Sequence, residues 1–170
     1  MKILIISDIH GITENLNILD KIIFDKLICL GDIYSYGISS EDEKNNLLVE
    51  EKLKQYQDKL ICLRGNCDYP NHNLFALTDL YKDIVDNHKL YFTHGNRYSY
   101  SKGYIDDTNY ILIYGHEHVP YIKKESNNSY ICVGSLSKPR YGSVASYAIY
   151  ENNMIYLYNI NGTIIDSINI

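Results

Sequence analysis

Two histidines separated by one residue, His116 and His118, carry the clearest chemical information in this chain of 170 residues. They follow the apolar run Tyr110 to Tyr114 and Gly115. Side chains at positions i and i+2 of an extended segment point the same way, so both imidazoles can face one site. Neutral imidazole is a common ligand of divalent transition metals. Taken alone, the pair is equally compatible with two histidines at the polar edge of a loop.

Four further apolar runs end in the same way, with side chains that can bind a metal, usually beside a glycine. These ends are Asp8 and His10 after Ile3–Ile6, Asp32 after Leu27–Leu30, Asn66 and Asp68 after Leu60–Leu63, and His94 after Leu90–Thr93. Short, continuous apolar runs suit strands that are covered on both faces. In open α/β sheets the ligand site lies beyond the carboxyl ends of the strands. Five such ends predict one crevice lined by Asp, Asn and His side chains.

Three of these residues also have an interpretation that involves no metal. Asp8 could cap a following helix, Asn66 could be a turn residue, and His94 could simply end a strand. His88 and His72 lie outside the repeated pattern. His88 is typical of a turn, whereas His72 is close enough to Asn66 in sequence to reach the crevice.

Two helices are predicted between the first three strands. The first follows Thr13 as its cap, and the second begins with the capping-box pattern of Ser40 and Glu43 and runs to about Gln57. The expected core faces are Leu16, Leu19, Ile22 and Ile23 in the first helix, and Val49, Leu53 and Tyr56 in the second. The other face of the second helix is charged, which indicates a solvated surface. Alternation of strands and helices indicates right-handed crossovers and a parallel sheet.

From Lys82 onward the sequence predicts short strands joined by tight turns. The turn dipeptides are Asn87-His88, Asn127-Asn128, Asn152-Asn153 and Asn161-Gly162, and the last three strands are Ser146–Tyr150, Ile155–Ile160 and Thr163–Ile168. A helix is expected at Tyr98–Tyr110. The prediction is one domain over residues 1–170, of class α/β (α+β), with two packed mixed β-sheets and helices outside.

The composition narrows the classes of function. The formal net charge of −5 argues against broad binding to a long nucleic acid. No apolar run is long enough to span a bilayer, and the first residues lack the pattern of a signal peptide. Cys29, Cys62 and Cys132 lie in apolar strands, so we expect all four cysteines, Cys67 included, to be reduced in a cytoplasmic protein.

The motifs Asp8-x-His10, Gly31-Asp32, Gly65-Asn66-x-Asp68, His94-Gly95 and Gly115-His116-x-His118 resemble the five motifs of calcineurin-like metallophosphoesterases. They occur in the family's order and span most of the chain. The short length and the Gly-Asn-Cys-Asp variant are most similar to the small bacterial YfcE-type phosphodiesterases. The resemblance implies a four-layer α/β/β/α sandwich.

The resemblance also implies a metal-ligand set. It assigns Asp8, His10, Asp32 and His118 to one metal, and Asp32, Asn66, His94 and His116 to the other. A ligand shared by two cations must be a carboxylate or a hydroxide, which suits Asp32. Oxygen and imidazole ligands together favour two divalent ions, most simply Mn²⁺, with Zn²⁺, Fe²⁺, Ni²⁺ and Co²⁺ as alternatives. A metal-bridging hydroxide would then attack phosphorus.

Other motif residues have further expected roles. Arg64 could neutralise phosphoryl oxygens, or it could form a surface ion pair. Asp68 is expected to accept hydrogen bonds that orient a neighbouring group. Cys67 stands where many family members have a histidine, which argues against strong general acid catalysis. The Gly134-Ser135 loop resembles one that would close the site through backbone amides, and Ile33–Ser40 is expected to line the crevice.

Three functions fit these observations. The leading one is a metal-dependent phosphodiesterase or phosphatase acting on a small phosphoester. A non-catalytic scaffold of the same fold, like a subunit of the retromer coat, is the alternative, but there the ligands are degraded and here every position is filled. A nuclease of the same superfamily would usually have capping domains and a basic surface. The sequence leaves a homo-oligomer open.

Overall fold

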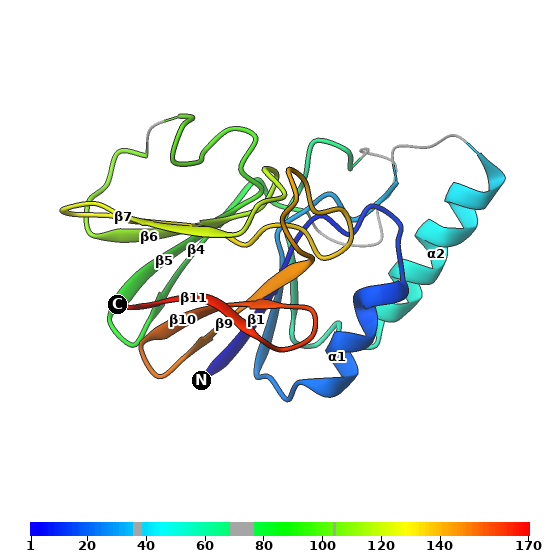
Figure 1. Ribbon diagram of the computed structural model, residues 1–170, viewed down its shortest axis with the longest axis horizontal. Helices are drawn as coiled ribbons and strands as arrows, with labels where there is room; N and C mark the ends of the chain where they lie inside the picture. The colour runs from blue at the N-terminus through cyan, green and yellow to red at the C-terminus, as the bar shows by residue number, and fades with distance from the viewer. Residues whose placement is uncertain (36–38, 69–76, 104) are drawn as a thin grey trace.

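Two β-sheets packed face to face form the centre of the protein, and the helices lie outside one of them (Figure 1). The computed structural model describes residues 1–35, 39–68, 77–103 and 105–170. Within these residues no helix is both long and apolar enough to cross a bilayer.

The first sheet has six strands in the order β11-β10-β9-β1-β2-β3. Its strands are β1 (Lys2–Ile6), β2 (Lys26–Cys29), β3 (Leu60–Cys62), β9 (Ser146–Glu151), β10 (Met154–Asn159) and β11 (Ile164–Asn169). β1, β2 and β3 are parallel, and β9, β10 and β11 form an antiparallel meander whose first strand pairs with β1. The predicted parallel half and C-terminal meander are both confirmed.

The second sheet has five strands in the order β4-β5-β6-β8-β7. They are β4 (Leu80–Val85), β5 (His88–Thr93), β6 (Tyr110–Tyr114), β7 (Tyr121–Lys124) and β8 (Ser129–Cys132). β5, β6 and β8 are parallel, and the two edge strands are antiparallel to their neighbours. Both sheets are therefore mixed, as the sequence predicts.

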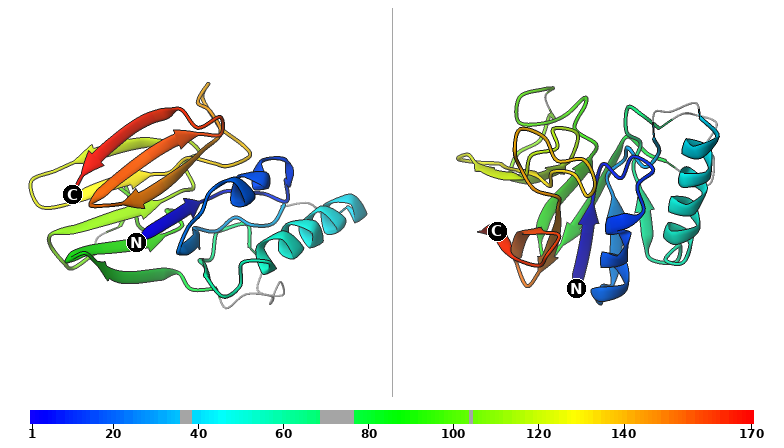
Figure 2. Two further views of the ribbon diagram at one scale, coloured as in Figure 1. Left: turned by 90° about the horizontal axis from the view of Figure 1, so that it is seen from below. Right: turned by 45° about the vertical axis from the view of Figure 1, so that its right-hand side comes forward.

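Alternate residues of β1 point into two different cores. Ile3 and Ile5 pack between the sheets, with Phe92 and Ile113 of the second sheet. Leu4 and Ile6 pack on the opposite face, against the helical layer. That layer contains the short helices η1 (Glu14–Asn17) and α1 (Ile18–Lys21) and the longer α2 (Ser40–Lys54). Figure 2 shows α1 and α2 on one side of the six-stranded sheet and the second sheet on the other. Burial on both faces explains why these strands are continuously apolar.

The predicted helix at Tyr98–Tyr110 is wrong. In the described residues of that range the chain makes bends, and a tyrosine-rich segment covers the outer face of the second sheet. Gly103 has a left-handed backbone (φ 70°), and a Cβ there would lie 2.2 Å from the Arg97 carbonyl oxygen. Asp107 accepts a hydrogen bond from the Thr108 amide, a local contact that competes with helix formation.

Three local predictions are displaced from their observed positions. The capping box is formed by Ser39 and Asp42, one residue before the predicted pair. Ile23 is 92% exposed because the chain is extended from Ile22 onward, so helical spacing no longer applies. The β4–β5 turn is centred on Asp86-Asn87, with φ values of 51° and 69°, instead of Asn87-His88.

Candidate metal centre

The loops that follow β1, β2, β3, β5 and β6 gather along one side of the molecule, at the upper middle of the view in Figure 1. The Asp8 amide donates to the Gly31 carbonyl, which joins the loops after β1 and β2. The Gly115 amide donates to the His94 carbonyl, which joins the loops after β5 and β6. The parallel strands thus bring their carboxyl ends to one place, as predicted from the apolar runs.

Asp8 lies at the centre of one group of ligand atoms. Its Oδ1 is 3.0 Å from His118 Nε2 and 3.7 Å from His10 Nε2, and the two Nε2 atoms are 3.3 Å apart. Its Oδ2 accepts hydrogen bonds from Ser7 Oγ (2.6 Å) and from the His116 amide (2.8 Å). The Asp8 carboxyl group is fully buried, and its Oδ1 has no hydrogen-bond donor among the described residues.

The histidine tautomers explain why that oxygen has no donor. His118 Nδ1 lies 2.5 Å from the Lys138 carbonyl oxygen, and His94 Nδ1 lies 3.1 Å from the Leu30 carbonyl oxygen. A carbonyl can only accept, so in each neutral ring Nδ1 bears the proton and Nε2 presents a lone pair. Lone pairs of nitrogen and carboxylate oxygen then face one another, an arrangement that a cation between them stabilises. Carbonyl-oriented rings of this kind are typical of metal-binding histidines.

Asp32 lies between the two sets of imidazole nitrogens. Its Oδ1 is 3.4 Å from His94 Nε2, and its Oδ2 is 3.8 Å from His10 Nε2. Oδ1 also accepts a hydrogen bond from the Cys67 amide (2.8 Å). Burial tends to raise the pKa of Asp32, but before a metal binds the hydrogen bond and positive charge of protonated His94 outweigh it and lower the pKa, and the carboxylate in turn raises the pKa of His94. The carboxylate is therefore held ionised and in contact with both sets.

Asn66 and His116 complete the predicted ligand set. Asn66 Oδ1 is 3.2 Å from His94 Nε2, and the His116 ring packs edge-on against the His94 ring with centroids 5.1 Å apart. Burial and the neighbouring His94 lower the pKa of His116, which favours its neutral form. His116 is half-buried, so it lies on the open side of the group.

Five of the seven predicted metal ligands have left-handed backbone conformations. The φ values are 55° for Asp8, 51° for His10, 50° for Asp32, 64° for His116 and 61° for His118. Such conformations are uncommon outside glycine, although Asp, Asn and His adopt them more readily than other residues. They turn each chain sharply at the strand end and direct the side chain into the shared site. Clustered backbone strain of this kind is characteristic of functional sites.

Two glycines let the loops approach closely. At Gly115 a Cβ would lie 1.8 Å from Ser7 Oγ and 2.4 Å from Asp8 Oδ2. At Gly65 a Cβ would lie 2.1 Å from both the amide nitrogen and Oδ1 of Asp32. Any side chain at either position would displace a predicted ligand.

Asp68 is hydrogen-bonded to the residues of the site, whereas Arg64 is exposed. Asp68 is buried and accepts hydrogen bonds from the amides of Asp32, Ile33 and Gly65, each at 2.8 Å. It therefore fixes the Asp32 loop through the backbone, an orienting contact of the kind predicted. Arg64 is exposed, and within the described residues it forms no ion pair with an acidic side chain.

Cys67 is half-buried, and its Sγ accepts a hydrogen bond from Asn66 Nδ2 (3.3 Å). Burial, together with the negative charge of Asp32, raises the pKa of the Cys67 thiol to about 12. The other three cysteines are buried free thiols.

The Gly134-Ser135 loop adjoins the site and contacts the residues around Asp8 and His118. The amides of Ser137 and Lys138 donate to Ser135 Oγ, and Ser135 Oγ itself donates to the Asp8 carbonyl. These two amides are therefore used within the loop, whereas the Leu136 amide donates to the Ser7 carbonyl beside Asp8 (2.9 Å). Closure of the site through backbone amides stays a prediction. The loop contributes the Lys138 carbonyl that orients His118. His72 and residues 36–38 of the Ile33–Ser40 loop lie outside the described residues.

Sequence reasoning missed the groups that orient the ligands. Two of them, the Leu30 and Lys138 carbonyls, are backbone atoms that any residue could supply. Ser7 is different, because its hydroxyl position directly before Asp8 was visible in the sequence. A hydroxyl beside a predicted carboxylate ligand could have been identified as its hydrogen-bond donor.

Known proteins share both the sequence pattern and the fold. Residues 1–154 match the model of the calcineurin-like phosphoesterase superfamily domain. The phosphodiesterase YfcE of Escherichia coli strain K12 is 28% identical over 171 residues, which cover 95% of this chain and 93% of that protein. A solved structure of the E. coli phosphoesterase Yfce has a TM-score of 0.85 at 26% identity and covers 99% of each chain.

A zinc complex of Vps29 from Entamoeba histolytica has a TM-score of 0.65 at 18% identity and covers 99% of each chain. That likeness concerns the fold. The family match covers most of the chain and agrees with the predicted motifs and sheet architecture. The chain belongs to the calcineurin-like phosphoesterase superfamily.

Proposed function

We propose that this protein is a metal-dependent phosphodiesterase that hydrolyses small phosphoesters at a centre of two divalent ions. The observation that carries the proposal is the position of Asp32, whose two carboxylate oxygens face different imidazole nitrogens, His94 Nε2 and His10 Nε2. A carboxylate in that position can serve two cations at once. The family match and the YfcE relative support phosphoester hydrolysis.

In this proposal two overlapping ligand sets hold the ions. Asp8, His10, Asp32 and His118 form one set, and Asp32, Asn66, His94 and His116 form the other. When bound, the ions supply an attacking hydroxide near neutral pH and positive charge opposite the phosphoryl oxygens. Manganese is the ion we propose, because the donors are carboxylate, amide and imidazole groups with no thiolate required.

The protein's own groups keep this site in one arrangement. The Lys138 and Leu30 carbonyls fix the ring orientation and tautomer of His118 and His94. Asp68 holds the loop of Asp32 through the backbone amides of Asp32, Ile33 and Tyr34. Preorganised ligands of this kind need little rearrangement during the reaction, which favours catalysis.

A second candidate is a scaffold of the same fold. The Vps29 structures favour it, because they share the fold over nearly the whole chain. Against it stands the complete donor set, in which carbonyl contacts select the tautomers that a metal requires.

Hydrolysis of bis(4-nitrophenyl) phosphate in the presence of manganese is the expected result that separates these candidates. Activity should require added metal, because the carboxylate, amide and imidazole side chains cannot supply the positive charge that the ions would provide. EDTA should abolish the activity. The assay would measure nitrophenolate release with Mn²⁺, Zn²⁺, Ni²⁺, Co²⁺, Fe²⁺ and no metal. Activity that EDTA leaves unchanged, or no activity with any ion, would reject the enzyme and favour the scaffold.

Cys67 is expected to leave the departing alcohol without strong acid assistance. A thiol whose pKa is raised to about 12 is a poor proton donor near neutral pH. The kcat/KM of the wild-type protein should therefore fall steeply as the pKa of the leaving group rises. Cys67→His should flatten that dependence, with a gain of up to roughly 10²-fold on alkyl esters and little on nitrophenyl esters.

The measurement is kcat/KM for a series of diesters with graded leaving groups, in both proteins. Cys67→Ser is the matched control, because it keeps the size of the side chain without adding an imidazole. A shallow slope in the wild-type protein would show that another group acts as the acid.

A further inference from the structure

A cavity of about 470 Å³ opens directly beside the metal centre. His116 forms part of its wall, so the cavity begins where the predicted ligands end. Glu117, Val119 and Tyr121 continue the wall from His116, and two other segments complete it, with Lys102 in one and Arg140 and Tyr141 in the other. A phosphoester bound at the centre would extend one of its ester groups into this space.

The cavity wall carries two cationic side chains that have no acidic partner among the described residues. Lys102 and Arg140 are exposed, and neither lies within 4.0 Å of an acidic side chain in the described part of the chain. By contrast, Lys26, Lys52 and Lys89 are each ion-paired at 2.6 Å. Two unpaired cations in one cavity are notable in a chain whose formal net charge is −5. Such a local positive field attracts anionic ligands.

The backbone of Arg140 is hydrogen-bonded to the backbone of His118, a predicted metal ligand. Its amide donates to the His118 carbonyl (3.2 Å), and Ser143 Oγ donates to the same carbonyl (2.9 Å). The Ser143 amide closes a tight turn on the Arg140 carbonyl. The start of the Arg140 side chain is therefore placed at a set position relative to the metal centre.

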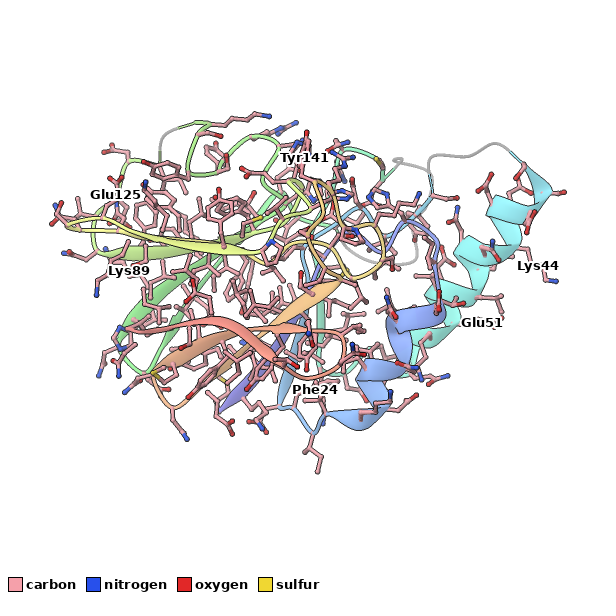
Figure 3. All side chains as sticks on the ribbon, viewed as in Figure 1. Phe24, Lys44, Glu51, Lys89, Glu125 and Tyr141 are labelled. Atoms are coloured by element: carbon pink, nitrogen blue, oxygen red, sulfur yellow. The ribbon has the colours of Figure 1, made fainter. Side chains whose placement is uncertain are left out.

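The same turn presents Tyr141 to solvent. Tyr141 has a left-handed backbone (φ 53°) and is 92% exposed, which is unusual for a bulky aromatic residue. Figure 3 shows it at the upper edge of the view, midway along the molecule. The turn thus displays an arginine and a ring at the rim of the cavity, and neither contributes to the core.

Glu117, the acidic residue in the cavity wall, already accepts a hydrogen bond from a neighbouring side chain. Glu117 Oε2 accepts a hydrogen bond from the Tyr121 hydroxyl (3.1 Å), and Tyr121 in turn pairs with the hydroxyl of Tyr114. Two free cations therefore stand against one carboxylate that is already engaged. The balance of charge in the cavity favours an anion.

We propose that this cavity is a second subsite, in which Lys102 and Arg140 bind an anionic group on the ester arm of the substrate. The inference rests on the proposed phosphodiesterase function and narrows its substrate class. The preferred substrates are phosphodiesters with an arm that carries a further negative charge, such as a carboxylate or a second phosphate.

Binding of two unreactive phosphonates tests the subsite without turnover. 3-Phosphonopropionate and propylphosphonate have arms of similar length, and only the first carries a carboxylate. Calorimetry on the manganese-loaded protein should give a roughly tenfold tighter Kd for 3-phosphonopropionate, the size expected from two partly exposed ion pairs. The double variant Lys102→Gln/Arg140→Gln should reduce the ratio to about twofold or less.

Lys44→Gln is the matched control, because it removes the same charge from an exposed position on α2, far from Tyr141 (Figure 3). It should keep the tenfold ratio. Equal Kd values in the wild-type protein would overturn the proposal. So would a ratio that survives in the double variant, since the carboxylate would then be binding elsewhere.

Two esters with the same leaving group test the substrate class. The wild-type protein should favour 4-nitrophenyl 2-carboxyethyl phosphate over 4-nitrophenyl propyl phosphate in kcat/KM by roughly tenfold, and the double variant should lose that preference. A preference for 4-nitrophenyl phosphorylcholine would overturn the proposal and point to Glu117 as the selecting group. If no ester is hydrolysed, the phosphodiesterase function fails, whereas the phosphonate ratio still decides the subsite.

Discussion

Replacement of Asp32 by Asn is expected to lower kcat for bis(4-nitrophenyl) phosphate by roughly 10³-fold or more, beyond the 10–100-fold typical of groups that only orient a ligand. Asn preserves the size of the side chain and tolerates the left-handed backbone found at this position (φ 50°). It removes the negative charge and replaces one of the two oxygens that face His94 and His10. The loss would therefore report on the shared carboxylate and not on a collapsed loop.

Elemental analysis after dialysis measures the accompanying change in metal content. The wild-type protein should retain two manganese ions per chain, and Asp32→Asn should retain fewer. His88→Gln is the control, because it removes an imidazole at the start of β5, away from the metal centre. One ion or fewer in the wild-type protein would contradict the two-ion centre, as would full metal content and activity in Asp32→Asn.

Gly115→Ala is expected to lower the free energy of unfolding by about 3 kcal/mol and to weaken metal binding at the same time. The added methyl group would lie 1.8 Å from Ser7 Oγ and 2.4 Å from Asp8 Oδ2, and both residues are fully buried. Neither neighbour can move aside without breaking the Ser7–Asp8 hydrogen bond of 2.6 Å. Urea unfolding of the metal-free protein and manganese titration of the folded protein would measure the two effects separately.

Gly162→Ala provides the matched comparison. Gly162 lies in the β10–β11 turn, has φ 86°, and has open space where the methyl group would go. Its substitution should cost only the left-handed backbone penalty of about 1 kcal/mol and leave manganese affinity unchanged. If Gly115→Ala proved no more destabilising than Gly162→Ala, the result would contradict the close packing of Gly115 against Ser7 and Asp8.

The strands were predictable because their burial leaves a direct trace in the sequence. β6 has the predicted bounds, Tyr110–Tyr114, and the C-terminal meander agrees to within about a residue because Asn-rich turns separate its apolar runs. The Tyr98–Tyr110 range misled the prediction, since Tyr98 and Tyr110 pack onto a sheet face and not along a helix. An apolar pattern records which side chains are buried, but not which neighbouring element buries them.

The ligands of the candidate site could be predicted, but the groups that orient them could not. Parallel pairing places the carboxyl ends of the strands together, so we could expect Asp8, Asp32 and His94 to lie close to one another. The carbonyls that fix the histidine tautomers could not be predicted, because their positions depend on how loops distant in sequence pack together. Lys102 and Arg140 were missed for the same reason. They lie in irregular loops, where no spacing pattern links a side chain to the cavity that it lines.

The left-handed conformations at Asp8, His10, Asp32, His116 and His118 limit which substitutions this chain can accept at those positions. Residues with a branched Cβ are severely strained in that conformation, whereas Asp, Asn and His adopt it more readily than other residues with a side chain. Selection for a stable backbone therefore favours the same three residue types as selection for catalysis. A descendant that lost its enzymatic role would keep much of the motif for conformational reasons, and its first informative changes would occur where φ is negative, at Asn66 and His94.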